Sequence, residues 1–166
     1  PLGGLWGLAF RALGVRDTVA AFQADADANW ISRNEPEVWS AIRQYGLLSA
    51  WLVARLTGRF ADSSASQVGY LPFDFRRSTW AAKRDWKWQV APFERDWLPE
   101  LVPPTGILGQ LTGEAAAATG LLPGLPVVAA AGDKQCEALG AGALPPNVPA
   151  LSFGSTATIA TTQRRY

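Results

Sequence analysis

The sequence has no histidine and no methionine, and its single cysteine is Cys136. Without histidine the chain cannot form an imidazole-dependent catalytic triad or a metal site built from cysteine and histidine. A lone cysteine cannot form an internal disulfide, and within a helix it usually behaves as a small apolar residue. Carboxylates, hydroxyls and backbone amides therefore remain to carry any chemistry.

An excess of charge of one sign is also lacking, since 15 Lys and Arg face 14 Asp and Glu. The net charge of +1 is too small to indicate nucleic acid or anionic lipid as a main partner. The apolar opening, residues 1–10, has no basic segment before it and is followed at once by Arg11, which fits neither a signal peptide nor a membrane span. We therefore predict a cytoplasmic protein without nucleic-acid or membrane partners, and the lack of methionine is compatible with a piece of a longer gene product.

The chain is nevertheless apolar enough for a core, with 48% hydrophobic residues in 166, the usual size of one globular domain. A helix is predicted from Pro36 to Leu56, because proline suits a first helical turn and Gly58 supplies a stop. Its core face is predicted from apolar residues close to a 3.6-residue period. These residues are Trp39, Ile42, Leu47, Trp51 and Leu52.

The middle of the chain carries turn-forming residues. Arg59 to Phe75 is predicted to be a loop followed by short extended structure, and Trp80 to Leu98 to hold short helices divided near Pro92. Leu101 to Gly106 contains Pro103 and Pro104, which predict an extended connector.

The last third alternates between extended and helical patterns, and this order predicts an α/β architecture. The expected elements are extended 107–111, a helix over 112–119 with Thr112 as cap and Gly120 as stop, a buried strand over 126–131, a helix over 134–139, and two strands over 150–162 that meet near Gly154.

Asp133 follows the predicted buried strand and Gly132, at the point where a helix begins. A carboxylate there sits at the edge of a sheet, where α/β proteins bind ligands. The alternative is a helix cap that accepts hydrogen bonds from the amides of Gln135 or Cys136. The local sequence leaves both open.

Residues 153–158, FGSTAT, form a glycine turn with hydroxyls between apolar strands. Exposed amides and hydroxyl donors in such a turn suit phosphate oxygens. An ordinary hairpin in which Gly154 supplies unusual dihedral angles explains the same residues, and it stays open as an alternative.

Together these segments resemble the FGGY family of carbohydrate kinases, which includes glycerol, xylulose and gluconate kinases. The resemblance extends from about Phe22 to the C-terminus. Six further segments resemble motifs of the family and follow one another in the same order as in the family. They are WISRNEPE at 30–37, RLTG at 55–58, DSSAS at 62–66, LGQLT at 108–112, ATGL at 118–121 and GLPV at 124–127.

The resemblance implies part of an actin-like ATPase (ribonuclease H-like) fold, with residues 1–125 in the later part of a substrate domain and 126–166 opening a nucleotide domain. It implies ATP-dependent phosphorylation of a sugar or polyol hydroxyl, assisted by Mg²⁺. Asp133 would be the general base and would, with Gln135, contact the substrate, while Gly154, Ser155 and Thr156 would contact ATP. No residue is assigned as a metal ligand, and a homo-oligomer of the parent protein is left open.

The sequence also departs from the family pattern. Asp25, Asp27 and Asn29 stand near the place of a frequent lysine, and Lys134 stands between Asp133 and Gln135. The family's N-terminal D.GT hairpin and C-terminal adenosine segment are not in this sequence, so we expect the chain alone to be inactive. The alternatives are a non-catalytic scaffold or regulatory module of the same fold, and a carbohydrate-binding domain that stacks sugars on its tryptophans. The tryptophans considered for stacking are Trp80, Trp86, Trp88 and Trp97.

Overall fold

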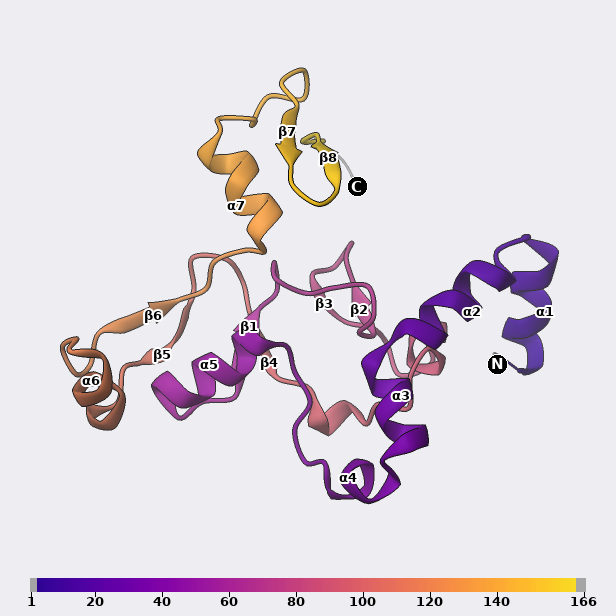
Figure 1. The fold of residues 1–166 in the computed structure, drawn as a ribbon, viewed down its shortest axis with the longest axis horizontal. Coiled ribbons are helices and arrows are strands. Elements are labelled where there is room, and N and C mark those ends of the chain that lie inside the picture. Colours follow the sequence, from indigo (N-terminus) through magenta and orange to yellow (C-terminus); the bar gives the residue numbers. More distant parts are fainter. Residues whose placement is uncertain (1–2, 164–166) are drawn as a thin grey trace.

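The structure is a computed structural model that describes residues 3–163 (Figure 1). The α-helices are α1 (Gly4–Ala12), α2 (Arg16–Asp25), α3 (Asp27–Asn34), α4 (Pro36–Ala41), α5 (Leu48–Thr57), α6 (Gly113–Thr119) and α7 (Asp133–Gly140). The 3₁₀ helices are η1 (Trp86–Gln89) and η2 (Arg95–Trp97). The strands are β1 (Ala61–Ser63), β2 (Phe73–Asp74), β3 (Thr79–Trp80), β4 (Glu100–Val102), β5 (Ile107–Gln110), β6 (Pro126–Val128), β7 (Ala150–Phe153) and β8 (Ala157–Ala160).

The strands of the described chain form two-stranded sheets. β1 and β4 pair in parallel, whereas β2–β3, β5–β6 and β7–β8 are antiparallel. Helices and strands alternate in the second half of the chain, which confirms the predicted α/β class.

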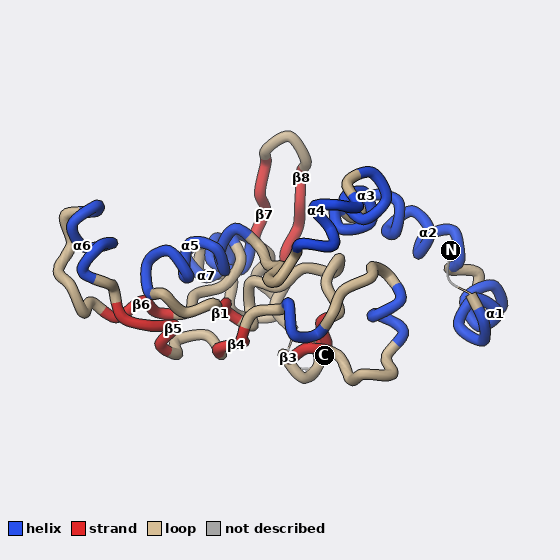
Figure 2. Tube along the Cα trace, turned by 90° about the horizontal axis from the view of Figure 1, so that it is seen from below, coloured by secondary structure: helices blue, strands red, loops and turns tan. Residues whose placement is uncertain are grey.

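The elements spread into distinct regions. Figure 1 shows α1 to α4 on one side, α5 with β1 and β4 near the centre, and β5, β6 and α6 on the other side. The helix α7 and the β7–β8 hairpin stand apart from these regions, and Figure 2 shows the hairpin projecting with its turn at the free end. Within the described residues, no helix is long and apolar enough to cross a membrane.

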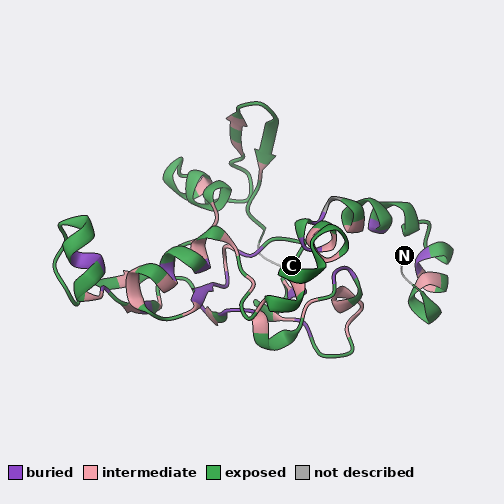
Figure 3. Ribbon diagram, turned by 60° about the horizontal axis from the view of Figure 1, so that its bottom comes forward, coloured by how far each residue is buried: buried purple, intermediate pink, exposed green. Residues whose placement is uncertain are grey.

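The main apolar core lies where α5 packs on the central strands. It joins residues from α5, β1, β4 and β5 with the residue after β6, and Figure 3 shows that most of the surface around it is exposed. A second, smaller cluster forms under α6, where Leu56 packs against the helix. The core residues are Val53, Ala61, Val102, Leu108 and Ala129 in the first cluster, and Leu111, Ala115 and Ala116 in the second.

The local start and stop signals of the helices are confirmed. Gly58 and Gly120 end α5 and α6 with φ of 73° and 74°, a left-handed conformation that glycine adopts at little cost. Thr112 caps α6 by accepting a hydrogen bond from the amide of Ala115 at 3.2 Å. The two 3₁₀ helices lie on either side of Pro92, as the sequence predicts.

The single helix predicted from Pro36 to Leu56 is wrong, because α4 ends at Ala41 and α5 begins at Leu48. The amide of Tyr45 donates to the carbonyl of Trp97 at 2.8 Å, a tertiary hydrogen bond that replaces a helical one. Gly46 also lies in close packing, since a Cβ there would come within 2.9 Å of the Ala50 Cβ. The chain therefore changes direction between the two helices.

The predicted core face of this helix is wrong as well. Trp51 and Leu52 are 56% and 44% exposed, whereas Ala50 and Val53 are buried. The break after α4 rotates α5 relative to the pattern of a continuous helix, so different residues face β1.

Two extended segments also differ from expectation. The predicted connector from Leu101 to Gly106 begins inside β4, where Leu101 pairs with Asp62. The predicted buried strand 126–131 ends at Val128, and Val128 is 52% exposed. β6 pairs with β5 in a two-stranded sheet, so one edge and much of its surface stay open.

Candidate active site at the start of helix α7

Asp133 is the first residue of α7, and its side chain is exposed. Its Oδ1 accepts a hydrogen bond from the amide of Lys134 at 2.7 Å. The cap bonds of the alternative interpretation, to the amides of Gln135 or Cys136, are not formed, because Gly132 occupies the cap position and its carbonyl accepts the Cys136 amide. The cap interpretation is therefore wrong for Asp133.

The electrostatic setting of Asp133 leaves its carboxylate accessible. Among residues 3–163, the ion pairs do not include Asp133. The first turn of a helix carries partial positive charge from its free amides, which favours a carboxylate there. Asp133 is thus an exposed anion, held by the backbone and open to a ligand.

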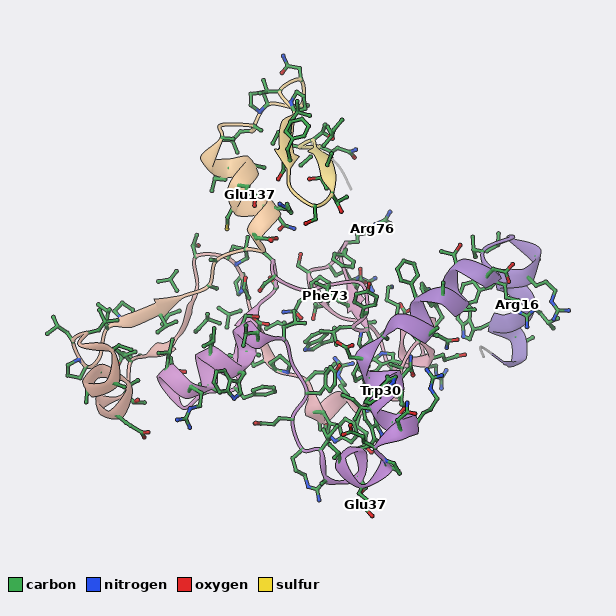
Figure 4. All side chains as sticks on the ribbon, in the orientation of Figure 1. Arg16, Trp30, Glu37, Phe73, Arg76 and Glu137 are labelled. Atoms are coloured by element: carbon green, nitrogen blue, oxygen red, sulfur yellow. The ribbon has the colours of Figure 1, made fainter. Side chains whose placement is uncertain are left out.

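The Lys134 side chain joins two elements, α7 and β7. Its Nζ lies 2.8 Å from Oε2 and 3.0 Å from Oε1 of Glu137, and it donates to Ser152 Oγ at 3.1 Å. The hydrogen bond with Glu137 raises the pKa of Lys134 above its ordinary value, and the charges of Glu137 and Asp133 add to this rise. Figure 4 shows Glu137 on α7, in the region that stands apart. The start of α7 is therefore tied to β7.

Gln135 folds back over the glycine that precedes Asp133. Its Oε1 lies 2.6 Å from the place that a Cβ on Gly132 would take, so Gly132 gives the carboxamide its room. Gln135 and Lys134 also line a hollow of about 520 Å³ whose other wall is the end of β8 and the residues after it, Ile159 to Thr162. Gln135 is therefore close to the backbone of the Asp133 segment and beside a hollow.

Residues 154–156 form the turn of the β7–β8 hairpin, since Phe153 pairs with Ala157. All three are exposed, and a Cβ on Gly154 would meet no atom within 4 Å. The hairpin geometry is as predicted, but Gly154 is not among the glycines with positive φ in the described chain, so it supplies no unusual φ. The hairpin meets α7 through Ser152 and not through this turn, and the described contacts do not bring the turn onto Asp133.

A second carboxylate, that of Asp62, is buried near the segment that precedes Asp133. Asp62 is 1% exposed and lies in β1; the end of β1 and the turn that follows it form the segment named the loop Asp62–Gln67. It accepts hydrogen bonds from the Ser63 amide at 2.8 Å, Ser49 Oγ at 2.8 Å, Gln67 Nε2 at 3.1 Å and Ser66 Oγ at 3.2 Å. Sequence reasoning used this segment as a family pattern and gave Asp62 no role. The sequence feature that could have identified Asp62 is the cluster of hydroxyl and amide side chains that follows it.

The loop Asp62–Gln67 also contacts the Asp133 segment directly. Ser63 Oγ donates to the carbonyl of Ala130, and the amide of Gly132 donates to the carbonyl of Ala65 at 3.2 Å. The backbone just before the candidate base is thus held by the loop.

The tryptophans considered for sugar stacking have contacts within the protein. Trp80 Nε1 donates to the carbonyl of Pro99 at 2.9 Å, and its ring packs on Phe73, which Figure 4 labels. Trp88 Nε1 donates to Ala82 at 3.0 Å, and Trp97 packs edge-on against Trp39 at 5.3 Å. Trp86 packs on Phe10 at 5.1 Å. These contacts give each ring a structural role.

Asp27 and Asn29, two of the residues that depart from the family pattern, lie in α3, away from α7. Asn29 donates to the carbonyl of Val90 at 2.7 Å, so it ties α3 to the segment after η1. Asp27 and Tyr45 line a hollow of about 480 Å³. Burial raises the pKa of the Tyr45 phenol, and the charge of Asp27 adds to the rise.

The chain is similar in sequence to known carbohydrate kinases. The sequence pattern of the N-terminal domain of the FGGY family of carbohydrate kinases matches residues 16–140. The chain is 35% identical over 130 residues to xylulose kinase of Escherichia coli, an alignment that covers 76% of this chain and 25% of that protein. It is 39% identical over 110 residues to an uncharacterized sugar kinase of the same organism, YgcE, covering 64% and 22% respectively.

A solved structure shows the same fold. The xylulose kinase of Rhodospirillum rubrum superposes with a TM-score of 0.71 at 29% identity, over 86% of this chain and 33% of that one. The chain belongs to the FGGY family of carbohydrate kinases and forms part of their actin-like ATPase fold. It spans about a quarter of the length of the curated relatives named above.

Proposed function

We propose that the parent protein is a kinase that transfers a phosphoryl group from ATP to a hydroxyl of a sugar or polyol, with Asp133 as the general base. The observation that carries the proposal is the exposed Asp133 carboxylate at the start of α7, in a chain of the FGGY family. Phosphoryl transfer leaves little covalent work to the protein, so a placed base and placed donors supply most of what it needs.

The setting of Asp133 supports this proposed role. One oxygen, Oδ1, is oriented by the Lys134 amide, which leaves Oδ2 for a substrate hydroxyl. A carboxylate in that position accepts the hydroxyl proton as the oxygen attacks the phosphoryl group. Gln135 lies two residues after Asp133 in α7 and lines a hollow. Its carboxamide can donate a hydrogen bond to another substrate hydroxyl or accept one from it.

The turn Gly154–Thr156 is proposed to contact the phosphates of ATP. Its exposure and the hydroxyls of Ser155 and Thr156 support this proposal. The turn is open rather than enclosed, and it lies at the free end of the hairpin (Figure 2). With ATP at the turn and the acceptor at Asp133, phosphoryl transfer therefore requires the hairpin and α7 to face each other across the reacting groups.

The described residues do not fit a complete Mg²⁺ site. They contain no group of three or more His, Cys, Asp or Glu side chains that could hold a metal ion. We assign no residue of this chain to the metal that sugar kinases use with ATP, and Asp133 is assigned to the substrate alone.

The acceptor is proposed to be a ketose or a related polyol. Support comes from the relatives, among which are xylulose kinases and an autoinducer-2 kinase of Yersinia enterocolitica, 30% identical over 131 residues. The cytoplasmic location, the lack of nucleic-acid and membrane partners and a homo-oligomer of the parent remain predictions.

The domain boundary between residues 125 and 126 also remains a prediction. β6 lies just after it and pairs with β5 before it, and the family's N-terminal domain pattern continues to residue 140. We expect the 166-residue chain alone to be inactive, because it spans about a quarter of the length of its relatives.

The proposal is tested with the full-length parent protein, ATP and a panel of acceptors that includes D-xylulose, D-gluconate and glycerol. A coupled assay of ADP formation should show turnover that depends on at least one acceptor. Acceptor binding without ADP formation would instead favour the carbohydrate-binding alternative, and neither binding nor turnover would favour the scaffold.

A further inference from the structure

The loop Asp62–Gln67 is built around a carboxylate that water does not reach. Each oxygen of Asp62 takes two donors: Oδ1 accepts from the Ser63 amide and Ser66 Oγ, and Oδ2 accepts from Ser49 Oγ and Gln67 Nε2. A buried carboxylate is tolerated only when its oxygens are satisfied in this way. The four donors come from α5 and from the loop itself, so the loop is fixed to the core.

Ser63 connects the loop to the segment that precedes Asp133. Its Oγ accepts a hydrogen bond from the amide of Ala65 at 3.2 Å, which orients the hydroxyl, and it donates to the carbonyl of Ala130. Ser63 is 3% exposed, so water cannot easily replace it as a donor to Ala130.

The segment that receives these bonds has no regular structure of its own. β6 ends at Val128 and α7 begins at Asp133, and the residues between them lie in neither element. The Ala130 carbonyl is bound by Ser63, and the Gly132 amide by the Ala65 carbonyl. Gln135 also lies over Gly132, with the Ala65 carbonyl 3.9 Å from the place of a Gly132 Cβ. The loop therefore fixes the backbone between the end of β6 and Asp133, where α7 begins.

We infer that Ser63, held by the buried Asp62, is a positioning residue that fixes the backbone ahead of Asp133 and so places the general base on the substrate hydroxyl. This inference rests on the proposed function of Asp133. A base must lie within hydrogen-bond reach of its proton, and a displacement of about 1 Å can cost roughly 100-fold in rate. Ser63 contacts no substrate in this account and acts through Asp133.

The first test compares Ser63→Ala with Ser64→Ala in the full-length kinase, with ATP and D-xylulose or whichever acceptor of the panel is phosphorylated. Ser64 is the matched control, because it is also buried but meets β4 through its backbone amide, which donates to the Val102 carbonyl. Ser63→Ala should lower kcat by about 10-fold to 100-fold, with the KM for ATP within about twofold. Ser64→Ala should keep both constants near those of the parent.

A double-mutant cycle separates positioning from general stability. In an Asp133→Asn background, Ser63→Ala should cause no further loss of kcat, because residues that act as a unit are not additive. An equal loss in both backgrounds would contradict the inference. If Ser63→Ala does not yield folded enzyme, Ser66→Ala, which removes one donor to Asp62, replaces it in the same cycle.

Hydrogen exchange supplies a readout that needs no activity. In the full-length protein without ligands, Ser63→Ala should speed exchange of the Gly132 and Lys134 amides more than Ser64→Ala does. Unchanged exchange there would overturn the inference. If Asp133→Asn abolishes turnover but Ser63→Ala behaves like Ser64→Ala, the inference fails while the proposed function stands. If Asp133→Asn keeps its turnover, the proposed base is wrong and the inference falls with it.

Discussion

Lys134 Nζ lies 3.1 Å from Ser152 Oγ, so the helix that begins with Asp133 is tied to the hairpin that carries the turn Gly154–Thr156. This link joins the two parts of the candidate site that the described contacts otherwise leave apart. Lys134 also stands where the sequence departs from the family pattern.

Replacing Lys134 by Ala should loosen the hairpin. We expect the KM for ATP of the full-length enzyme to rise by about two- to fivefold, since exposed pairs of this kind contribute little, while kcat changes less. Lys83→Ala, at another exposed lysine, is the control and should leave the KM unchanged. An unchanged KM in Lys134→Ala would mean that the link does not serve nucleotide binding.

Replacing Ser155 by Ala tests the turn itself. A hydroxyl that binds phosphate acts in the ground state and the transition state alike, so the KM for ATP should rise more than kcat falls. Thr158→Ala, on β8 of the same hairpin, is the comparison. Equal constants for the two variants would speak against a phosphate contact at Ser155.

The buried face of α5 can be tested by stability. Val53 is 6% exposed and packs in the core, so Val53→Ala should lower the free energy of unfolding of the chain by about 1.5–3 kcal/mol. Leu52 is 44% exposed, and Leu52→Ala should cost less than about 1 kcal/mol. Denaturant unfolding of both variants measures the difference, and a reversed order would restore the face predicted from a continuous helix.

The stability of the chain should depend on pH through the pair Arg59 and Glu100. The Arg59 guanidinium donates two hydrogen bonds to the Glu100 carboxylate, one to each oxygen. The hydrogen bond with Arg59 lowers the pKa of Glu100 below its ordinary value of 4.5. Because the folded-state pKa is lowered, the pair's contribution to stability is present above pH 4.5 and is lost as the pH falls through the folded-state pKa.

A carboxyl titration of Glu100 by NMR measures this effect. The midpoint should lie below 4.5 in the chain and return toward that value in Arg59→Ala. Arg55→Ala is a suitable control, because Arg55 approaches Glu114 at 4.0 Å and not Glu100. The same Glu100 midpoint with and without the Arg59→Ala substitution would show that the pair is not formed in solution.

The features that the sequence predicts well are those that neighbouring residues determine. Gly58, Gly120 and Thr112 act within one turn of a helix, so their roles could be recognised without the fold. The two strands around Gly154 likewise follow from local pattern. The family itself could be recognised because its motifs keep their order along the chain.

The features that the sequence misses depend on distant contacts. The break between α4 and α5 follows from a hydrogen bond between Tyr45 and Trp97, and no local pattern contains it. The exposure of β6 depends on which strands pair with it. The buried network of Asp62 needs Ser49 from α5, and the helix-cap alternative for Asp133 fails because the cap position falls one residue earlier, at Gly132.

The central claim is that Asp133 removes the proton from the substrate hydroxyl, and Asp133→Asn in the full-length kinase tests it most directly. Asparagine keeps the size of the side chain but is not a base. A general base contributes about 10²- to 10⁴-fold, so kcat should fall at least 10²-fold while the dissociation constant for ATP changes little. Near-normal turnover in Asp133→Asn would contradict the account.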